Sequence, residues 1–321
     1  MASGPLLAVL DLGTNNCRLL IAAPIGLSGR QGFRAVDSFS RIVRLGEGLG
    51  QTGLLSEAAV DRTIEALKIC AEHIGRHNVT HVRAIATQAA RLARNSDVLI
   101  ARARAEAGID IAIISAQEEA DLAALGCAPL IGREYKGALV FDIGGGSTEI
   151  IWLVKSPQGP QQRLSASVPV GVVSLAEQYG MDAKDHSCFE RVCDAMRERF
   201  APFAERMASD FDSRKFHLLG TSGTVTTLAA IALGLPRYNR SRVDASWHET
   251  RHMLKVVHDL AGLDVAALAR IGSIGPERAD LMLAGCAIFA AICALWPSPM
   301  LRVADRGLRE GMLRQLTECA S

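Results

Sequence analysis

The sequence ALVFDIGGGSTEIIWL, from Ala138 to Leu153, joins two apolar runs through an aspartate, Asp142, and a glycine triplet. An apolar run, a glycine-rich turn and a second apolar run are typical of two strands that form a hairpin. Glycine permits positive φ angles and places no Cβ in front of the main chain, so consecutive N–H groups can bind one phosphate. We therefore predict a phosphate-binding turn with a carboxylate beside it. The turn consists of Gly144, Gly145, Gly146 and Ser147.

A second stretch, LAVLDLGTNNCRLLIA from Leu7 to Ala22, repeats this layout in the first half of the chain. Asp11 takes the place of Asp142, and polar residues follow the glycine of the turn. The repeat predicts two related halves rather than a series of short units. Two hairpins of this kind would define a cleft that holds a phosphate chain and a divalent cation. The candidate residues of this turn are Gly13, Thr14 and Asn15.

The composition is that of an ordinary globular protein. The 321 residues are 49% hydrophobic and 21% charged, with a net charge of +1, which predicts two domains and gives no sign of a nucleic-acid or membrane partner. The eight cysteines form no C-x-x-C pair, and no secretion signal is evident, so we expect a reduced, cytoplasmic protein without structural zinc. The apolar run from Leu281 to Trp296 is too short to span a membrane and predicts a buried helix.

Strand and helix signals alternate after the first hairpin. The stretch Gln31 to Val43 predicts a third strand, and Ser56 begins a long helix with one apolar stripe. Further strands are expected from Val79 to Ala86 and from Ile109 to Ile114. Three strands followed by alternating helices and strands indicate an α/β layer with a mixed, ribonuclease-H-like sheet.

Two adjacent glutamates begin the next helix. Ser115 and Glu118 have the spacing of a capping box, in which each side chain bonds a backbone N–H at the start of the helix. This interpretation gives Glu118 a structural role and leaves Glu119 without one. The helix N-terminus favours the ionised carboxylate that a general base needs. We predict that Glu119 is the base; the alternative is an ordinary solvated glutamate.

The second half contains another glycine turn. The stretch HLLGTSGTVTTLA, from His217 to Ala229, reads as a strand, a turn and a helix. Such a turn can bind an anion at the helix N-terminus, although it can also merely connect two elements. The candidate phosphate-binding residues here are Gly220, Ser222 and Gly223.

Other segments of this half complete the predicted domains. A strand region is expected from Leu164 to Val173, after a loop from Lys155 to Gln162, and a helix from about Ser187 to Ser209. The loop Arg237 to Arg242 carries three arginines, which indicates either a solvated loop or a guide for an anionic substrate. A strand from Met300 to Ala304 precedes a last helix that we expect to return to the first domain. The predicted domains are residues 1–124 with about 305–321, and residues 125–304.

Two common nucleotide-binding motifs are absent. The sequence contains no G-x-x-x-x-G-K-[ST], and Gly144-x-Gly146-x-x-Glu149 lacks the third glycine of a dinucleotide fingerprint. These absences exclude a P-loop NTPase and a Rossmann dehydrogenase.

Taken together, the motifs resemble those of the exopolyphosphatase and guanosine pentaphosphate phosphatase (Ppx/GppA) family, within the actin, hexokinase and heat-shock chaperone ATPase superfamily. This resemblance implies two ribonuclease-H-like, actin-like ATPase domains with an interdomain cleft, bound Mg²⁺, and release of terminal orthophosphate from a phosphoanhydride. The matching motifs are, in chain order, DLGTNNCRLLIA, RLGEGL, ATQAARLARN, ISAQEEA, FDIGGGSTEI, PVGVVSL, GTSGT and GLREGML.

The resemblance also implies roles for single residues. Asp11 and the turn Gly13–Asn15 match the first phosphate motif of the family, and Arg91 matches an arginine associated with phosphate binding. Glu119 matches the catalytic glutamate of the E-E-A motif, and we expect it to deprotonate the attacking water. The residues expected to hold Mg²⁺, directly or through water, are Asp142 and Glu149.

The sequence departs from the family pattern in two places. Arg306 replaces the small residue usual in the closing S-D-G-A-L-R-E-G motif, and Val243-Asp-Ala replaces a common Val-His-Gly. Substrate contacts near these two loops are therefore open.

The resemblance implies a family that acts on both inorganic polyphosphate and guanosine pentaphosphate. We expect an Mg²⁺-dependent exopolyphosphatase acting on inorganic polyphosphate, because a chain with arginine-bearing loops needs no pocket for a base. Guanosine pentaphosphate is the alternative substrate, and a homodimer is left open. Two other functions remain as alternatives: a sugar or acetate kinase, which would need an acceptor hydroxyl, and a non-hydrolytic nucleotide sensor or filament subunit.

Overall fold

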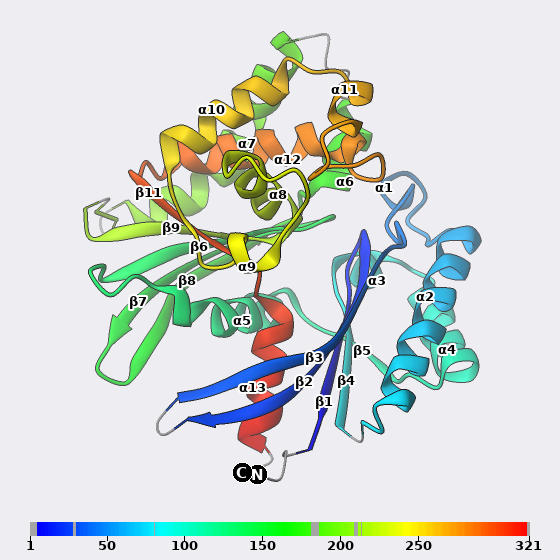
Figure 1. Cartoon of the computed structure of the whole chain (residues 1–321). Coiled ribbons are helices and arrows are strands. Elements are labelled where there is room, and N and C mark those ends of the chain that lie inside the picture. Colours follow the sequence, from blue (N-terminus) through cyan, green and yellow to red (C-terminus); the bar gives the residue numbers. More distant parts are fainter. Residues whose placement is uncertain are drawn as a thin grey trace. The chain divides into compact units, whose positions relative to one another are not determined.

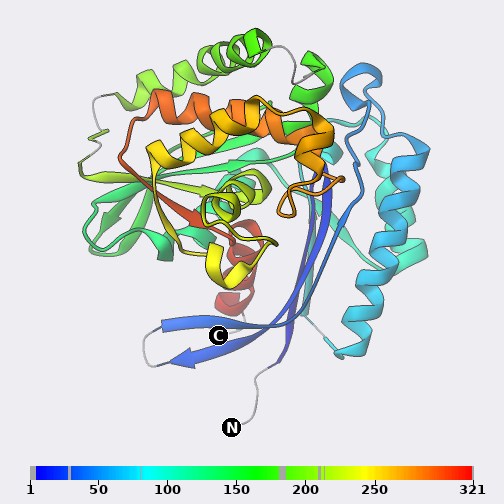
Figure 2. The same cartoon turned by 45° about the horizontal axis from the view of Figure 1, so that its top comes forward.

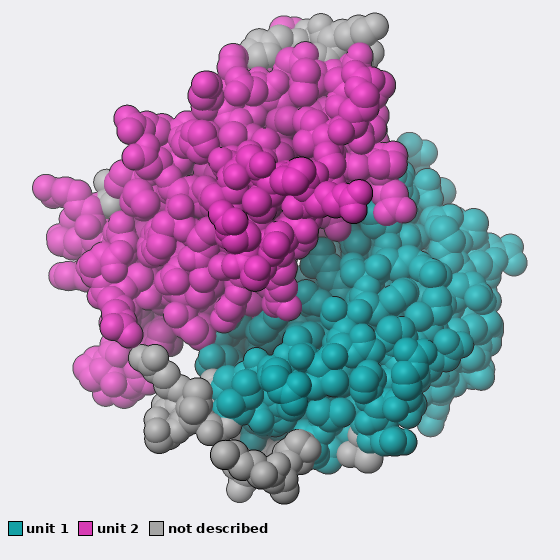
Figure 3. Space-filling model, viewed as in Figure 1, with its two compact units in different colours: residues 1–126, 308–321 teal, residues 127–307 magenta. Residues whose placement is uncertain are grey.

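The computed structural model describes residues 5–27, 30–79, 81–180, 186–208, 211–212 and 214–319. The chain divides into two compact units, which Figure 3 colours separately. Unit 1 comprises residues 1–126 and 308–321, and unit 2 comprises residues 127–307. Each unit contains its own mixed sheet and its own hydrophobic core.

Unit 1 is built on a five-stranded sheet with the order β3-β2-β1-β4-β5 (Figure 1). The first three strands are antiparallel, and β4 and β5 run parallel to β1. The strands are β1 Leu7–Leu12, β2 Asn16–Leu27, β3 Arg30–Ile42, β4 His81–Ala86 and β5 Ile111–Ile113. The helices are α1 Leu49–Thr52, α2 Glu57–Arg76, α3 Gln88–Leu92, α4 Ser96–Ala107, α5 Ala116–Cys127 and α13 Leu308–Cys319.

Strand β1 is buried on both faces, which explains its continuous apolar sequence. Leu10 and its same-face neighbours pack with α2, whose first turn is capped by Ser56, as predicted: the Ser56 hydroxyl accepts the Ala59 N–H at 3.2 Å. On the other face, Leu7 and Val9 pack with side chains of α13. The last helix therefore supplies part of the core of unit 1.

Helices α5 and α13 approach each other within unit 1 at backbone distance. A methyl group added at Gly311 would lie 2.0 Å from the carbonyl oxygen of Leu122. Only a glycine fits such a contact, because real Cβ atoms do not come this close to other heavy atoms. Gly311 therefore fixes how deeply α13 packs against α5.

Unit 2 is built on a six-stranded sheet with the order β10-β11-β9-β6-β7-β8. Its strands are β6 Gly137–Ile143, β7 Thr148–Ser156, β8 Gly159–Val168, β9 Phe216–Thr221, β10 Trp247–Glu249 and β11 Met300–Ala304. Its helices are the 3₁₀ turn η1 Ala128–Leu130, α6 Val172–Tyr179, α7 His186–Met207, α8 Ser222–Ala232, α9 Arg240–Val243, α10 Thr250–Ala261, α11 Val265–Ala269 and α12 Ala279–Leu295.

The two sheets repeat one topology. Strands β8-β7-β6-β9-β11 follow the order β3-β2-β1-β4-β5, with three antiparallel strands and two strands parallel to the central one. The repeat read from the twin hairpins is thus present at the level of whole sheets. The prediction of two ribonuclease-H-like α/β domains is confirmed.

Helix α12 is buried in unit 2, as predicted from its apolar run. It lies alongside α7 (Figure 2), and Phe289 packs against Phe141 of the sheet with their ring centroids 6.0 Å apart. Among the residues that the structure describes, no helix is long and apolar enough to cross a membrane.

Two predicted segments of unit 2 were wrong. The expected loop from Lys155 to Gln162 is mostly paired, because β7 and β8 continue to the pairs Lys155 with Pro160 and Ser156 with Gly159. The proline is tolerated there because β8 is an edge strand. The expected strand region ends at Val168, and Val172 begins α6 instead.

The buried His217 of β9 predicts a loss of stability in acid. Its Nε2 accepts the Gly132 N–H at 3.1 Å and its Nδ1 donates to the Leu218 carbonyl oxygen at 2.8 Å, so the neutral ring is fixed. Burial lowers the pKa of His217 to about 4, from an ordinary value of about 6.5. Between these values the unfolded state binds a proton that the folded state does not. Proton uptake by the unfolded state has no effect above about pH 6.5, and below about pH 4 it has lowered the free energy of unfolding by about 3 kcal/mol.

Urea unfolding of wild type and His217→Gln at pH 7 and pH 5 tests this. The glutamine variant lacks the penalty, so its free energy of unfolding relative to wild type should rise by about 2 kcal/mol between pH 7 and pH 5. A difference that stays constant between the two pH values would contradict a buried, neutral His217.

Candidate active site

The first glycine turn lies between β1 and β2 and is tightly braced. The Gly13 N–H donates to the Asn16 carbonyl oxygen at 2.9 Å and closes the turn. The Asn15 carbonyl oxygen accepts the N–H groups of Val43 and Arg44 at 2.9 and 3.0 Å, and the Thr14 carbonyl oxygen accepts the Gly46 N–H at 2.9 Å. Arg44 and Gly46 belong to the RLGEGL motif. The side-chain atoms Asn15 Oδ1 and Asn16 Nδ2 are buried without a hydrogen-bond partner. Buried polar atoms are normally satisfied, so this turn suits a polar ligand.

Asp11 is the second-last residue of β1, just before the first glycine turn. Arg18 is its cross-strand neighbour on β2. Burial raises the pKa of the Asp11 carboxyl, while the charges of Arg18 and Arg309 act in the opposite direction. The carboxyl therefore keeps its proton to a higher pH than an ordinary aspartate.

Glu119 and Arg91 lie side by side within unit 1. Both Nη1 and Nη2 of Arg91 donate to Oε2 of Glu119 at 3.1 Å, and Nη1 also donates to the Ile114 carbonyl oxygen at 2.9 Å. Arg91 lies on α3, after β4, and Glu119 lies in the first turn of α5, after β5. Two residues singled out separately in the sequence thus form one fixed pair. The capping argument had left Glu119 without a structural role, but the structure shows that its carboxylate pairs with Arg91.

The neighbouring Glu118 forms only half of the predicted capping box. The Ser115 hydroxyl accepts the Glu118 N–H at 3.1 Å, as expected. Among the described contacts, however, the Glu118 carboxylate bonds Arg83 at 2.8 Å and not the Ser115 N–H. The reciprocal bond of the box was predicted wrongly, because an arginine on β4 supplies a charged donor that the local sequence does not reveal.

The second glycine turn lies between β6 and β7 and is fastened by the start of α6. The Gly144 N–H donates to the Ser147 carbonyl oxygen at 2.9 Å. The carbonyl oxygens of Gly144 and Gly145 accept the N–H groups of Val172 and Val173 at 3.0 and 2.8 Å. Two N–H groups at a helix start, which have no partner in their own helix, are thus used to hold the turn.

Both turns depend on a glycine from another segment. A methyl group added at Gly46 would lie 2.3 Å from Cγ2 of Thr14. One added at Gly171 would lie 2.4 Å from the carbonyl carbon of Gly145 and 2.5 Å from the Gly146 nitrogen. The PVGVVSL motif therefore supports the second turn as RLGEGL supports the first.

Asp142 and Glu149 are direct cross-strand partners on β6 and β7. Such pairs have Cβ atoms about 5 Å apart, so both carboxylates can reach one cation. Glu149 is only 2% exposed, and its Oε1 accepts the Ser167 hydroxyl at 2.8 Å. Mg²⁺ is usually bound by one or two carboxylates together with water and substrate phosphates. The donor set fits this mode, and no group of three ligand-type side chains suited to a metal occurs among the described residues.

The GTSGT turn connects β9 to α8 as predicted, but its residues differ in role. Gly220 is buried in the middle of the sheet, where an added methyl group would lie 2.6 Å from the ring of Phe141. Packing thus gives this position a reason to be glycine, and the phosphate role of Gly220 stays a prediction. Ser222 has a φ of +75° and donates its hydroxyl to the Ile143 carbonyl oxygen at 2.6 Å. Gly223 follows it in the first turn of α8.

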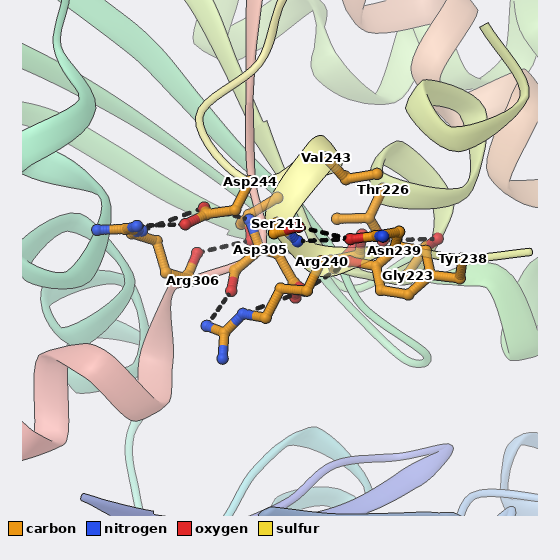
Figure 4. Close-up of polar contacts among 12 residues, drawn as sticks. Gly223, Thr226, Tyr238, Asn239, Arg240, Ser241, Val243, Asp244, Asp305 and Arg306 are labelled. Carbon is orange, nitrogen blue, oxygen red and sulfur yellow. Dashed lines mark hydrogen bonds and ion pairs between the residues drawn. The ribbon is translucent and has the colours of Figure 1, made fainter. Parts of the chain in front are cut away.

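Asp305 was not among the candidate residues predicted from the sequence; it directly follows β11, as Asp142 directly follows the apolar run of β6. The signal was the same in both places: an aspartate directly after an apolar strand. The two departures from the family pattern also meet here, because Arg306 forms an ion pair with Asp244 (Figure 4). Burial opposes ionisation of Asp244, but hydrogen bonds and charge from Arg306 outweigh it and lower the pKa of that carboxyl.

A model of the Ppx/GppA phosphatase family matches residues 26–318. The chain belongs to the Ppx/GppA phosphatase family. Exopolyphosphatase 2 of Mycobacterium tuberculosis is 32% identical over 290 residues, which cover 88% of each chain. A crystal structure of an exopolyphosphatase from Cytophaga hutchinsonii has a TM-score of 0.88 at 25% identity and covers 98% of both chains. The Ppx/GppA enzyme of Aquifex aeolicus has a TM-score of 0.78 at 27% identity, covering 97% of this chain and 99% of that one.

This membership confirms the family and the enzyme class predicted from the sequence, a phosphoanhydride hydrolase. The Ppx/GppA motifs coincide with the braced elements described above. The roles of the single residues remain predictions.

Proposed function

We propose that this Ppx/GppA phosphatase is an exopolyphosphatase that releases terminal orthophosphate from inorganic polyphosphate, with Mg²⁺ as cofactor and Glu119 as general base. The observation that carries the proposal is the fixed pair of Glu119 and Arg91. In this pair, the Glu119 carboxylate can take a proton from water, and the Arg91 guanidinium that contacts it can bind a phosphate oxygen.

The remaining candidate residues support the same chemistry. Hydrolysis of a terminal phosphoanhydride requires an in-line water and neutralisation of the phosphate charge, with little covalent work by the protein. The turns at Gly13–Asn15 and Gly144–Ser147 would bind phosphate oxygens through backbone N–H groups. Asp142 and Glu149 would hold Mg²⁺, which neutralises phosphate charge when it is bound. Water adds to the terminal phosphorus, the bond to the bridging oxygen breaks, and the shortened chain leaves.

Polyphosphate is preferred over guanosine pentaphosphate on two grounds. The loop from Arg237 to Arg242 places three arginines in unit 2, which suits a substrate made of phosphates alone. Relatives named exopolyphosphatase also match over most of their length. Guanosine pentaphosphate remains the competing substrate.

Release of orthophosphate from long-chain polyphosphate, without any acceptor, is the direct test. We expect release that requires Mg²⁺, stops with excess EDTA and resumes when Mg²⁺ is restored. The same assay with guanosine pentaphosphate gives the ratio of kcat/KM for the two substrates. A large preference for guanosine pentaphosphate would overturn the choice of substrate, and phosphate transfer that needs an acceptor would overturn the hydrolase.

A further inference from the structure

The two units share a second feature besides their hairpins: an arginine anchored at the same place in each sheet. In unit 1, Arg91 donates to the carbonyl oxygen of Ile114, the residue directly after β5. In unit 2, Arg240 donates through Nη2 to the carbonyl oxygen of Asp305, the residue directly after β11, at 2.7 Å. Strands β5 and β11 hold the same position in the two matching sheet orders. The repeat therefore extends to an anchored arginine.

Each arginine also has a carboxylate partner. Arg91 pairs with Glu119, and Arg240 Nε lies 3.4 Å from Oδ2 of Asp305. The Tyr238 hydroxyl donates to the same Asp305 oxygen at 2.5 Å. Burial and the charge of Asp305 raise the pKa of Tyr238, so its hydroxyl stays protonated and continues to donate. The carboxylate that orients Arg240 is thus itself oriented, as Figure 4 shows.

The backbone around Asp305 is held on the opposite side by Asp244. Its Oδ1 accepts the Asp305 N–H at 3.0 Å, and its carboxylate pairs with Arg306. The next residue, Ala245, has a φ of +66°, an unfavourable conformation for alanine that its surroundings must impose. The segment that anchors Arg240 is therefore fixed from two directions.

This segment lies against the second phosphate motif. The Thr221 hydroxyl donates to the Arg306 carbonyl oxygen at 2.9 Å. A methyl group added at Gly307 would lie 3.5 Å from the same hydroxyl and 3.9 Å from Oδ2 of Asp142. The anchor of Arg240 is thus continuous with the carboxylate expected to help hold Mg²⁺.

Resting on the function proposed above, we propose that Arg240 contacts a phosphate group of the substrate, and that Asp305 and Tyr238 are its positioning residues. The Arg240 side chain is 43% exposed although one side of it is anchored. A guanidinium held in one orientation loses less freedom when it binds a phosphate oxygen, and its planar donors match phosphate geometry. Arg240 is then the unit 2 counterpart of Arg91 and acts on binding rather than on proton transfer.

Arg240→Ala tests the contact through KM and through direct binding. Loss of a charged hydrogen bond should raise KM for polyphosphate about 10- to 100-fold and leave kcat within about threefold. Equilibrium binding of fluorescently labelled polyphosphate should weaken by a similar factor. Arg237→Ala removes the same charge from the same loop three residues earlier. It therefore measures the general attraction of the loop's charge for an anionic substrate, which is screened by salt and is expected to change both values less than about threefold. Melting temperatures of both variants identify any loss of folding.

Asp305→Asn tests the positioning role. It keeps an oxygen that can accept the Tyr238 hydroxyl but removes the charge that holds Arg240. We expect a smaller rise in KM than for Arg240→Ala. The double variant should bind polyphosphate no more weakly than Arg240→Ala alone, because both changes disrupt the same Arg240–Asp305 pair. Arg240→Lys keeps the charge and should recover only part of the affinity, since a lysine cannot reproduce the planar contacts.

Three results would overturn the inference. Equal effects of Arg240→Ala and Arg237→Ala would indicate unspecific attraction by charge. Unchanged KM and binding in a folded Arg240→Ala protein, or fully additive effects of Arg240→Ala and Asp305→Asn, would also contradict it. Failure of the proposed function is separate. If wild type binds polyphosphate without releasing orthophosphate, the exopolyphosphatase proposal is wrong, and the binding measurements alone decide the role of Arg240.

Discussion

Glu119→Gln is expected to lower kcat for orthophosphate release by about 10²- to 10⁴-fold. The amide has the shape of the carboxylate but cannot take a proton from water. It can still accept a hydrogen bond from Arg91, so that side chain keeps its anchor on the Ile114 carbonyl oxygen. KM should therefore change little. Steady-state kinetics with polyphosphate at saturating Mg²⁺ give both values.

Glu118→Gln is the matched control, because it makes the same change one residue earlier on the same helix. The Glu118 carboxylate is 43% exposed and pairs with Arg83, and exposed pairs of this kind contribute about 0–1 kcal/mol. Its kcat should stay near that of wild type. A folded Glu118→Gln protein without activity, beside an active Glu119→Gln protein, would reverse the assignment of the base. Wild-type rates in both would remove the general base from this helix.

Gly171→Ala is expected to disable the second phosphate turn from outside it. The added methyl group would lie 2.4–2.5 Å from backbone atoms of Gly145 and Gly146, and backbone cannot move aside as a flexible side chain can. A displacement of about 1 Å at a reacting group can cost about 10²-fold in rate, so kcat/KM should fall by about that factor. Overpacking of this kind costs about 1–3 kcal/mol in stability. Kinetics and thermal melting of the purified variant measure the two effects.

Gly262→Ala provides the control for this change in the same unit. Gly262 has a φ of −87°, which alanine accepts, and the added methyl group would lie 3.9 Å from the nearest atom, the Asp259 carbonyl oxygen. Activity and melting temperature should stay close to wild type. If Gly171→Ala behaved like Gly262→Ala, the start of α6 would not determine the geometry of the turn.

The hairpins could be read from the sequence because each is continuous in the chain. Asp11 and Asp142 are each the second-last residue of an apolar strand, just before its glycine turn. This local pattern correctly predicted two related sheets. The braces of the turns could not be predicted, since they come from distant segments. Gly46 contacts Thr14, and Gly171 contacts Gly145, only after the chain has folded.

The missed elements have the same origin. Val172 and Val173 are β-branched and favoured a strand, yet their N–H groups hold the second turn and begin a helix. Arg91 and Glu119 were predicted as separate site residues, and only the structure shows that their side chains pair. Asp305 carried a readable signal at the end of β11, but its partners Tyr238 and Arg240 lie more than sixty residues earlier in the chain.

The contribution of α13 to unit 1 has a consequence for biosynthesis. During translation, β1 emerges long before α13, the helix that packs on Leu7 and Val9. This apolar face of β1 lacks its covering helix until α13 has left the ribosome. All residues of unit 2 precede α13 in the chain, so unit 2 can fold before the core of unit 1 receives its last helix.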